Sequence, residues 1–281
     1  MDEQIARADL GAVGSLLEAG TGATVHAVPE LRLLDVSGPL AYKHYHDGHP
    51  PHGLRWAVRI RATLPPAARA RLATIACWPV RVVRDHGKIS GVLLPVIPAS
   101  FFEAPRPGQE TRQPRETRQL LGETTRAGTA ERFAVCRDLA GALAFLHAHG
   151  VVFGDVNGEN ALYRIGETPS LMLIGCDGVR IRGSTAVVKR PGTMQWRAPE
   201  GEPPTPETDV YKLGLFILRA LTPGPRAEAM RDPQRARNVL DAEGRRLLGA
   251  SLAELGHRRP PAAEWEAYFS ALARDGSRAG V

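Results

Sequence analysis

The sequence predicts an α+β fold in two parts, with an antiparallel β-sheet in residues 1–97 and a mainly helical part in residues 98–281. Strand-like stretches joined by glycine turns dominate the first part. Apolar residues at helical spacing dominate the second part, from Thr129 onward. Strands followed by helices, rather than a regular alternation of the two, are typical of an α+β protein.

Composition supports a folded protein with a full hydrophobic core. The 281 residues are 43% hydrophobic and 23% charged, which is ordinary for a globular chain. The net charge is +6, but the basic residues are scattered and no nucleic-acid-binding motif accompanies them. We therefore expect no nucleic-acid partner.

The cysteines and the apolar runs bear on the compartment. Cys77, Cys136 and Cys176 lie in apolar contexts without metal-ligand spacing, which favours reduced thiols. The acidic start does not resemble a signal peptide, and the longest apolar runs are too short to cross a bilayer. We expect a cytoplasmic protein with no membrane partner.

The first strands surround a glycine turn. Residues 11–28 predict two strands, with Gly20 and Gly22 in the turn between them and Val25 after it. Glycines let backbone N–H groups approach a phosphate, although a plain hairpin turn explains this segment about as well. The next strand ends at Lys43, one of only four lysines among 36 basic residues.

Two helices and a hairpin complete the first part. Residues 54–62 and 66–76 predict helices, and neither contains an acidic residue. Residues 78–83 and 91–96 predict an antiparallel hairpin that leads into the second part.

The second part begins with residues 105–128, which are rich in Pro, Gly, Thr, Gln and Arg and predict a solvated, flexible loop with one short helix. A helix follows from an N-cap at Thr129 to His149, with Phe133, Leu139 and Leu143 on its buried face.

A short apolar strand then leads into a polar loop. Asp155 and Asn160 lie in this loop, and Asp177 lies in a second acidic turn after a hairpin. An Asp and an Asn around a glycine often do no more than form a turn. Phosphoryl transfer, however, uses such a set, because one carboxylate orients the attacking hydroxyl while an amide and a second carboxylate hold Mg²⁺.

Further motifs appear in a fixed order along the chain. The interval from Asp155 to Asn160 is that of H-R-D-L-x-x-x-N, and Asp177-Gly178 stands where D-F-G would follow. Leu40-Ala41-Tyr42-Lys43 stands at the place of V-A-I-K, and Ala198-Pro199-Glu200 matches A-P-E. On these motifs nearly the whole chain resembles a eukaryotic-type (Hanks-type) Ser/Thr protein kinase of a divergent bacterial branch.

The resemblance implies a two-lobed kinase-like fold that binds Mg-ATP, or Mn-ATP, and phosphorylates a protein substrate. It implies that Asp155 accepts the proton of the substrate hydroxyl and that Asn157 stands where a lysine usually steadies the transferred phosphate. Asn160 and Asp177 would hold the metal. The nucleotide would contact a further set of residues: Gly20, Gly22, Val25, Ala41, Lys43, Leu94 and Val96.

The resemblance also implies two supporting contacts. Asp209 leads an apolar helix over residues 208–218 and would brace the backbone of the catalytic loop. Arg259, in a late Arg-Pro turn, would pair with Glu200.

Departures from the kinase pattern leave alternatives open. An active kinase pairs its strand lysine with a helical glutamate, which is missing here, so Asp177 is the nearest plausible partner for Lys43. Gly154 replaces the arginine of H-R-D, so activity should not depend on activation-loop phosphorylation. A pseudokinase scaffold is the main alternative. A small-molecule kinase of the aminoglycoside or choline type is less favoured, because that type lacks A-P-E. The sequence does not specify an oligomeric state.

Overall fold

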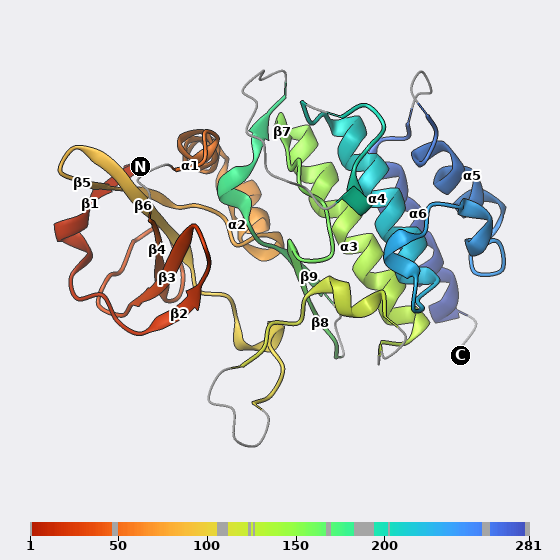
Figure 1. Cartoon of the computed structure of the whole chain (residues 1–281), viewed down its shortest axis with the longest axis horizontal. Coiled ribbons are helices and arrows are strands. Elements are labelled where there is room, and N and C mark those ends of the chain that lie inside the picture. The colour runs from red at the N-terminus through yellow and green to blue at the C-terminus, as the bar shows by residue number, and fades with distance from the viewer. Residues whose placement is uncertain are drawn as a thin grey trace. The chain divides into compact units, whose positions relative to one another are not determined.

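The computed structural model describes all residues except 1, 47–49, 106–111, 123–124, 126, 167–169, 183–193, 202, 255–258 and 279–281, and only the backbone of residues 275–278. The chain divides into two compact units (Figure 1). The N-terminal unit comprises Met1–Ala99 and Ile174–Arg180, and the C-terminal unit comprises Ser100–Leu173 and Ile181–Val281. Segment Ile174–Arg180, which the sequence placed in the second part, thus packs with the first.

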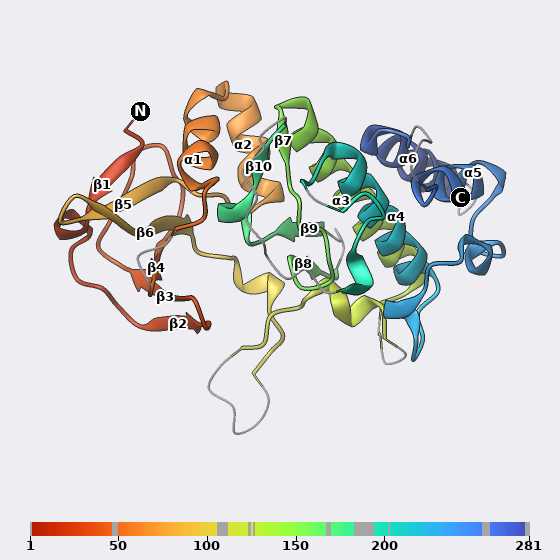
Figure 2. The ribbon, with the colours of Figure 1, turned by 45° about the horizontal axis from the view of Figure 1, so that its top comes forward.

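A six-stranded sheet forms the centre of the N-terminal unit (Figure 2). Its strands, in the order β1-β5-β6-β4-β3-β2, have the following bounds: β1 Gln4–Ala6, β2 Leu16–Ala19, β3 Ala23–Val28, β4 Leu40–Tyr45, β5 Arg81–Asp85 and β6 Lys88–Pro95. The predicted strand pairs are present, but the prediction of a purely antiparallel sheet is wrong, because β1 pairs with β5 in parallel. A three-residue edge strand is too short to give an alternating pattern in the sequence.

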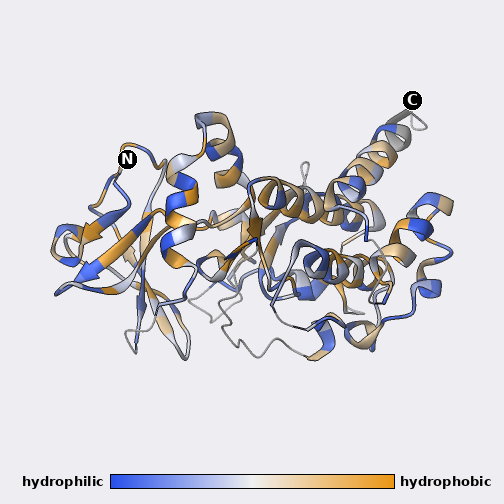
Figure 3. Cartoon of the chain, turned by 90° about the horizontal axis from the view of Figure 1, so that it is seen from above, coloured by the Kyte–Doolittle hydropathy of each residue, from blue (hydrophilic) through white to orange (hydrophobic). Residues whose placement is uncertain are grey.

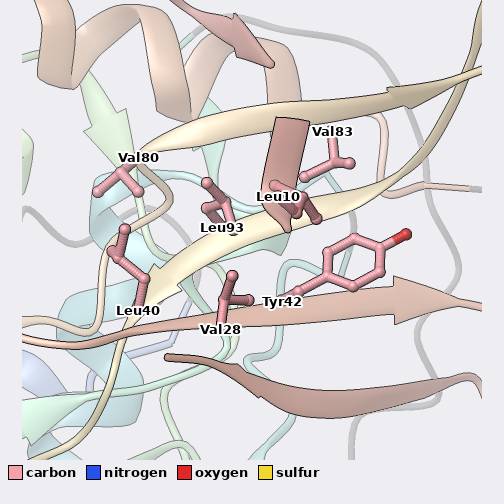
Figure 4. Packing of buried hydrophobic residues seen from close by; sticks show 7 residues of the cluster. All are labelled: Leu10, Val28, Leu40, Tyr42, Val80, Val83 and Leu93. Carbon is pink, nitrogen blue, oxygen red and sulfur yellow. The ribbon is translucent and has the colours of Figure 1, made fainter. Parts of the chain in front are cut away.

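Each face of this sheet carries its own hydrophobic cluster, because successive side chains of a strand point to opposite faces. On one face, Leu10 of the 3₁₀ helix η1 (Arg7–Leu10) packs against strand residues that include Leu40, Tyr42 and Leu93 (Figure 4). On the other face, Tyr45, Val82 and Val92 pack with residues of helix α1 (Leu54–Thr63). The second face also carries Lys43.

Both helices predicted for the N-terminal unit are present, with bounds within one residue of the expected ones. Helix α1 buries Leu54, Ala57 and Val58. Helix α2 (Pro66–Ile75) starts with a proline in its first turn, where no backbone N–H is required. Neither helix contains an acidic residue.

Four helices and several short elements form the described part of the C-terminal unit. The helices are α3 (Thr129–Ala148), α4 (Pro206–Leu221), α5 (Ala242–Ser251) and α6 (Ala262–Arg278). The strands are β7 (Val151–Val152), β8 (Ala161–Arg164) and β9 (Ser170–Leu173), while β10 (Arg180–Ile181) lies where the chain passes between the units. The 3₁₀ helices with all their residues in this unit are η3 (Thr117–Leu120), η5 (Met194–Trp196), η6 (Ala227–Ala229) and η7 (Pro233–Ala236).

Apolar stripes on the helices form the core of this unit. Phe133 of α3 and Phe269 of α6 have ring centroids 5.5 Å apart, and Figure 3 shows apolar and polar residues alternating along α6. The N-cap of α3 is Gly128 rather than the predicted Thr129, and its amide donates to the Glu131 carboxylate at 2.6 Å. Helix α4 begins before the predicted residue 208, because Thr205 accepts a hydrogen bond from the Thr208 amide and caps the helix at Pro206.

The segment predicted to be a solvated loop is only partly exposed. It contains the expected short helix, η3, but Thr117, Leu120 and Leu121 are buried. Two apolar residues among many polar ones were too weak a signal to predict this anchoring. Between Asp177 and Glu200 the sequence also predicts a basic loop over residues 179–191, most of which lies outside the described residues.

Candidate functional site

The structure joins two of the predicted site residues directly in the N-terminal unit. The Lys43 Nζ and Asp177 Oδ2 atoms are 2.8 Å apart, although the residues are 134 positions apart in the sequence. This confirms Asp177 as the acidic partner of Lys43. The Asp177 side chain is only 3% exposed and that of Lys43 is 23% exposed, so the pair is largely shielded from solvent.

A third residue, Tyr45, completes this group, which we call the Lys43 cluster. Its hydroxyl donates to the same Asp177 Oδ2 atom at 2.8 Å. Lys43 and Tyr45 are two residues apart on β4 and therefore point to the same face of the sheet. Asp177 comes from the 3₁₀ helix η4 (Cys176–Gly178), which belongs to the N-terminal unit.

Two buried thiols, Cys77 and Cys176, interact electrostatically with Asp177 and Lys43. Burial, followed by the nearby charge of Asp177, raises the pKa of Cys77 to about 12. Burial likewise raises the pKa of Cys176 well above its usual value. Neither thiol therefore ionises at neutral pH, and neither is suited to act as a nucleophile.

Several residues predicted to contact a nucleotide share the face of Lys43. Lys43 pairs with Val25 across β3, and Ala41 pairs with Leu94 across β6. Residues directly opposite each other in an antiparallel pair lie on one face, so these four side chains are neighbours. Gly20 and Gly22 lie in the turn between β2 and β3, where the Gly20 amide donates to the Ala23 carbonyl at 2.9 Å.

Val96 lies just past the end of β6, where its amide donates to the Pro39 carbonyl at 3.0 Å. This hydrogen bond holds the backbone after β6 against the residue that precedes β4. The nucleotide-contacting role of this residue and of the others on the face stays a prediction.

The C-terminal unit holds the other predicted catalytic residues together in one loop. Asp155 Oδ1 accepts from the Asn157 amide nitrogen at 3.0 Å, and Asp155 Oδ2 accepts from that of Asn160 at 2.7 Å. Asn157 Oδ1 in turn accepts from the backbone amides of Glu159 and Asn160. We call Asp155, Asn157 and Asn160 the Asp155 cluster; its carboxylate is fixed by two neutral donors.

Asp209, at the start of α4, holds the backbone that leads into this loop. Its carboxylate is fully buried and accepts from the amides of Phe153 and Gly154, both at 2.8 Å. His147 Nε2 lies 3.1 Å from the same carboxylate. The bracing contact predicted for Asp209 is confirmed, and it fixes the two residues before Asp155.

Lys212, one turn further along α4, was not predicted as part of the site. Its Nζ donates to the Gly154 carbonyl at 2.6 Å, so α4 holds both ends of the Gly154 residue. Gly154 has a φ of +80°, a conformation that favours glycine over the arginine of the kinase motif. The scarcity of lysine in the chain was the one available signal for Lys212.

Further along the chain, the predicted pair of Glu200 and Arg259 is also present. Arg259 Nη1 lies 2.5 Å from Glu200 Oε1, and the guanidinium lies 4.8 Å from the centre of the Tyr211 ring. Arg219 of α4 donates to the Gln195 carbonyl at 2.8 Å. Helix α4 therefore anchors the segment that ends at Glu200 as well as the Asp155 cluster.

The predicted metal ligands suit Mg²⁺ in donor type. A carboxylate from Asp177 and an amide oxygen from Asn160 are hard oxygen donors. Asn160 turns its amide nitrogen toward Asp155, so the amide oxygen is the atom that it could offer to a metal. Among the residues that the structure describes, no group of three or more His, Cys, Asp or Glu residues could hold a metal alone.

Comparisons with known proteins give partial matches. No family model matches the sequence. The chain is 30% identical over 99 residues to serine/threonine-protein kinase STE20 of Debaryomyces hansenii, covering 33% of this chain and 9% of that protein. It is 32% identical over 118 residues to U-box domain-containing protein 33 of Arabidopsis thaliana, covering 39% of this chain and 14% of that protein. The matches thus span small parts of both relatives.

The mixed α+β architecture, with its six-stranded sheet, is compatible with a two-lobed kinase-like fold. A partial match to a Ser/Thr kinase points in the same direction. In the portion of the chain that the structure covers, no helix is both long and apolar enough to cross a membrane.

Proposed function

We propose that this protein is an ATP-dependent kinase that transfers the γ-phosphoryl group to serine or threonine hydroxyls of a protein substrate. The ion pair of Lys43 and Asp177 carries this proposal. The two residues were assigned to kinase motif positions independently of each other. Their Nζ and Oδ2 atoms lie 2.8 Å apart, although the residues are 134 positions apart in the sequence. A chance match of two unrelated motifs gives no reason for such a contact.

In this reaction Lys43 would bind the α- and β-phosphates, and Asp177 and Asn160 would hold Mg²⁺ or Mn²⁺. The bound ion would supply charge neutralisation on the phosphates. Asp155 would orient the substrate hydroxyl and accept its proton. Its two hydrogen bonds from Asn157 and Asn160 keep the carboxylate in one orientation, which supports a positioning role.

Asn157 would take the place at which a lysine usually steadies the transferred phosphate. A neutral amide stabilises negative charge less than an ammonium group does, so we expect slow transfer. We expect neither nucleic acid nor a membrane as a partner. The three buried, free thiols support a reducing compartment such as the cytoplasm.

The test is transfer of labelled γ-phosphate to the protein itself and to a generic protein substrate. Asp155→Asn should lower the transfer rate at least about 100-fold, because the general base is lost. The matched control is Glu243→Gln, a similar change on the exposed surface of α5, which should transfer at the normal rate. Transfer by Asp155→Asn at the rate of the control would contradict the assignment.

A scaffold that binds nucleotide without transferring phosphate is the second candidate. The absence of any acidic residue on α1 favours it. A thermal shift with Mg-ATP that is not accompanied by transfer to any protein would support this candidate. Label on an aminoglycoside or a sugar would instead support a small-molecule kinase.

A further inference from the structure

Tyr45 contacts both members of the ion pair in the Lys43 cluster. Its hydroxyl donates to Asp177 Oδ2, and the Lys43 ammonium lies 5.7 Å from the centre of its ring, within the range of a cation–π contact. Tyr45 is buried, so its hydroxyl gains little from water, and donating to the carboxylate satisfies it. One side chain thus helps to set the positions of a buried anion and its cation.

Tyr45 also connects this pair to α1. Its ring lies in one packed cluster with Leu54 and Val58 of that helix. The start of α1 in turn approaches the chain just after Asp177: a β-carbon at Gly53 would come within 1.9 Å of the Val179 carbonyl oxygen. Only glycine permits this approach, so α1 packs against the turn that carries Asp177 as well as against Tyr45.

Helix α1 has no acidic residue with which to hold Lys43. Asp177 holds the lysine instead, and Asp177 is itself held by Tyr45. A movement of α1 would therefore reach the ion pair through the Tyr45 ring and through the turn at Val179, rather than through a salt bridge.

We propose that Tyr45 is the positioning residue of the Lys43 cluster, which holds the Asp177 carboxylate in place and transmits the position of α1 to it. The catalytic importance of Tyr45 rests on the proposed function, whereas its contacts with Asp177, Lys43 and α1 do not. If Asp177 binds a metal and Lys43 turns to phosphates, Tyr45 is the group that keeps the carboxylate oriented.

The first test needs no nucleotide. Tyr45→Phe keeps the ring and removes only the hydroxyl, and the matched control is Tyr42→Phe, on the opposite face of the same strand, whose hydroxyl bonds to Ser90 at 3.0 Å. The rate at which an amine-reactive ester acylates Lys43 is measured by peptide mass spectrometry, with exposed Lys88 as the internal reference. Thermal unfolding of each variant checks that it is folded.

We expect Tyr45→Phe to raise Lys43 acylation roughly threefold to tenfold relative to Lys88. Charge-assisted hydrogen bonds are among the strong ones, so without the Tyr45 hydroxyl the Asp177 carboxylate is held less firmly and keeps Lys43 less well engaged. Tyr42→Phe should leave the rate unchanged. If Tyr45 acts through Asp177, the hydroxyl should have no further effect in an Asp177→Asn background. An unchanged rate in Tyr45→Phe, or full additivity with Asp177→Asn, overturns the proposal.

The link to α1 has its own variant. Val58→Ala removes part of the helix surface that packs together with Tyr45, whereas Arg55→Ala changes an exposed position of the same helix. Val58→Ala should raise Lys43 acylation by a smaller factor, and Arg55→Ala should not. Equal rates in the two variants would show that α1 does not act through Tyr45.

The second test uses ATP with and without Mg²⁺. Tyr45→Phe should raise the Mg²⁺ concentration for half-maximal ATP binding roughly tenfold and leave Mg²⁺-independent binding unchanged. A purely structural role would weaken both. If the unaltered protein binds no Mg-ATP, the proposed function fails, while the acylation test still decides the role of Tyr45.

Discussion

The Lys43 cluster and the Asp155 cluster are built in opposite ways. The bonds of Asp155 go to Asn157 and Asn160, within five residues of it. Asp177, in contrast, bonds to Lys43 and Tyr45, which are more than 130 residues away. Local turn chemistry thus shapes the first group, whereas tertiary packing alone brings the second together. We expect the first to be rigid and the second to respond to the position of α1.

Helix α4 gives the C-terminal unit a support that the Lys43 cluster lacks. Its first turns hold the backbone before Asp155 through Asp209 and Lys212, and its later part holds the segment ending at Glu200 through Arg219. One buried helix therefore fixes two separate loops. Changes at α4 should cost more stability than changes near the Lys43 cluster.

The largest effect is expected for Asp209→Ala. This change leaves the Phe153 and Gly154 amides without their acceptor in a buried place, and we expect a loss of about 3–5 kcal/mol in the free energy of unfolding. Urea denaturation would measure it. Asp209→Asn, which keeps one acceptor oxygen, should lose less. A loss below about 1 kcal/mol for the alanine variant would mean that α4 does not give the Asp155 cluster the strong support that distinguishes it from the Lys43 cluster.

A smaller loss is expected for Lys212→Met, which keeps the side-chain stem and removes the donor to the Gly154 carbonyl. A hydrogen bond to a charged group contributes about 1.5–3 kcal/mol, so thermal and urea unfolding should show a change of that order. If Lys212 also positions Asp155, phosphoryl transfer should fall and Lys212→Arg should restore part of it. Full activity in the methionine variant would show that Lys212 contributes to stability but does not position Asp155.

The smallest effect concerns an ion cluster that ties α1 to the N-terminal sheet. Asp35 lies 2.6 Å from Arg61 of α1 and 2.5 Å from Arg81 of β5. Burial alone would raise the pKa of Asp35, but the hydrogen bonds and charges of Arg81 and Arg61 outweigh it and lower the pKa from 3.8 to about 2. A carboxyl group whose pKa is lowered by folding stabilises the folded state at pH values above its pKa in the unfolded chain. This contribution is lost as the pH falls through the pKa in the folded state.

We therefore expect Asp35 to contribute about 1–2 kcal/mol near neutral pH, fading between pH 4 and pH 2. The difference in unfolding free energy between the unaltered protein and Asp35→Asn, measured by urea denaturation across this range, should shrink toward zero at the acid end. A difference that stays constant with pH would mean that the arginines do not hold this carboxylate.

Sequence alone predicted the elements with strong patterns and the residues with motif spacing. The helices at 54–62, 66–76 and 129–149 and the hairpin around His86 are present within a few residues. The contacts of Asp209 and of Arg259 with Glu200 were also predicted, because each residue sits at a motif position.

The misses have two physical causes. Tyr45 and Lys212 stand at positions with no motif, and their roles arise only when distant segments pack together. The parallel strand β1 and the buried Leu120 and Leu121 were missed because short or isolated apolar runs carry little periodicity. Local signals predict what neighbours in sequence do, and they are silent on such long-range partners.

The hydrogen bonds from Phe153 and Gly154 to Asp209 join segments 56 and 55 residues apart. These two amides cannot be protected before α4 has docked, however early the local turn after Asp155 forms. In hydrogen–deuterium exchange these two amides should therefore exchange at the same slow rate as the amides in the core of α4. A ligand that slows exchange in α4 should also slow exchange at Phe153 and Gly154.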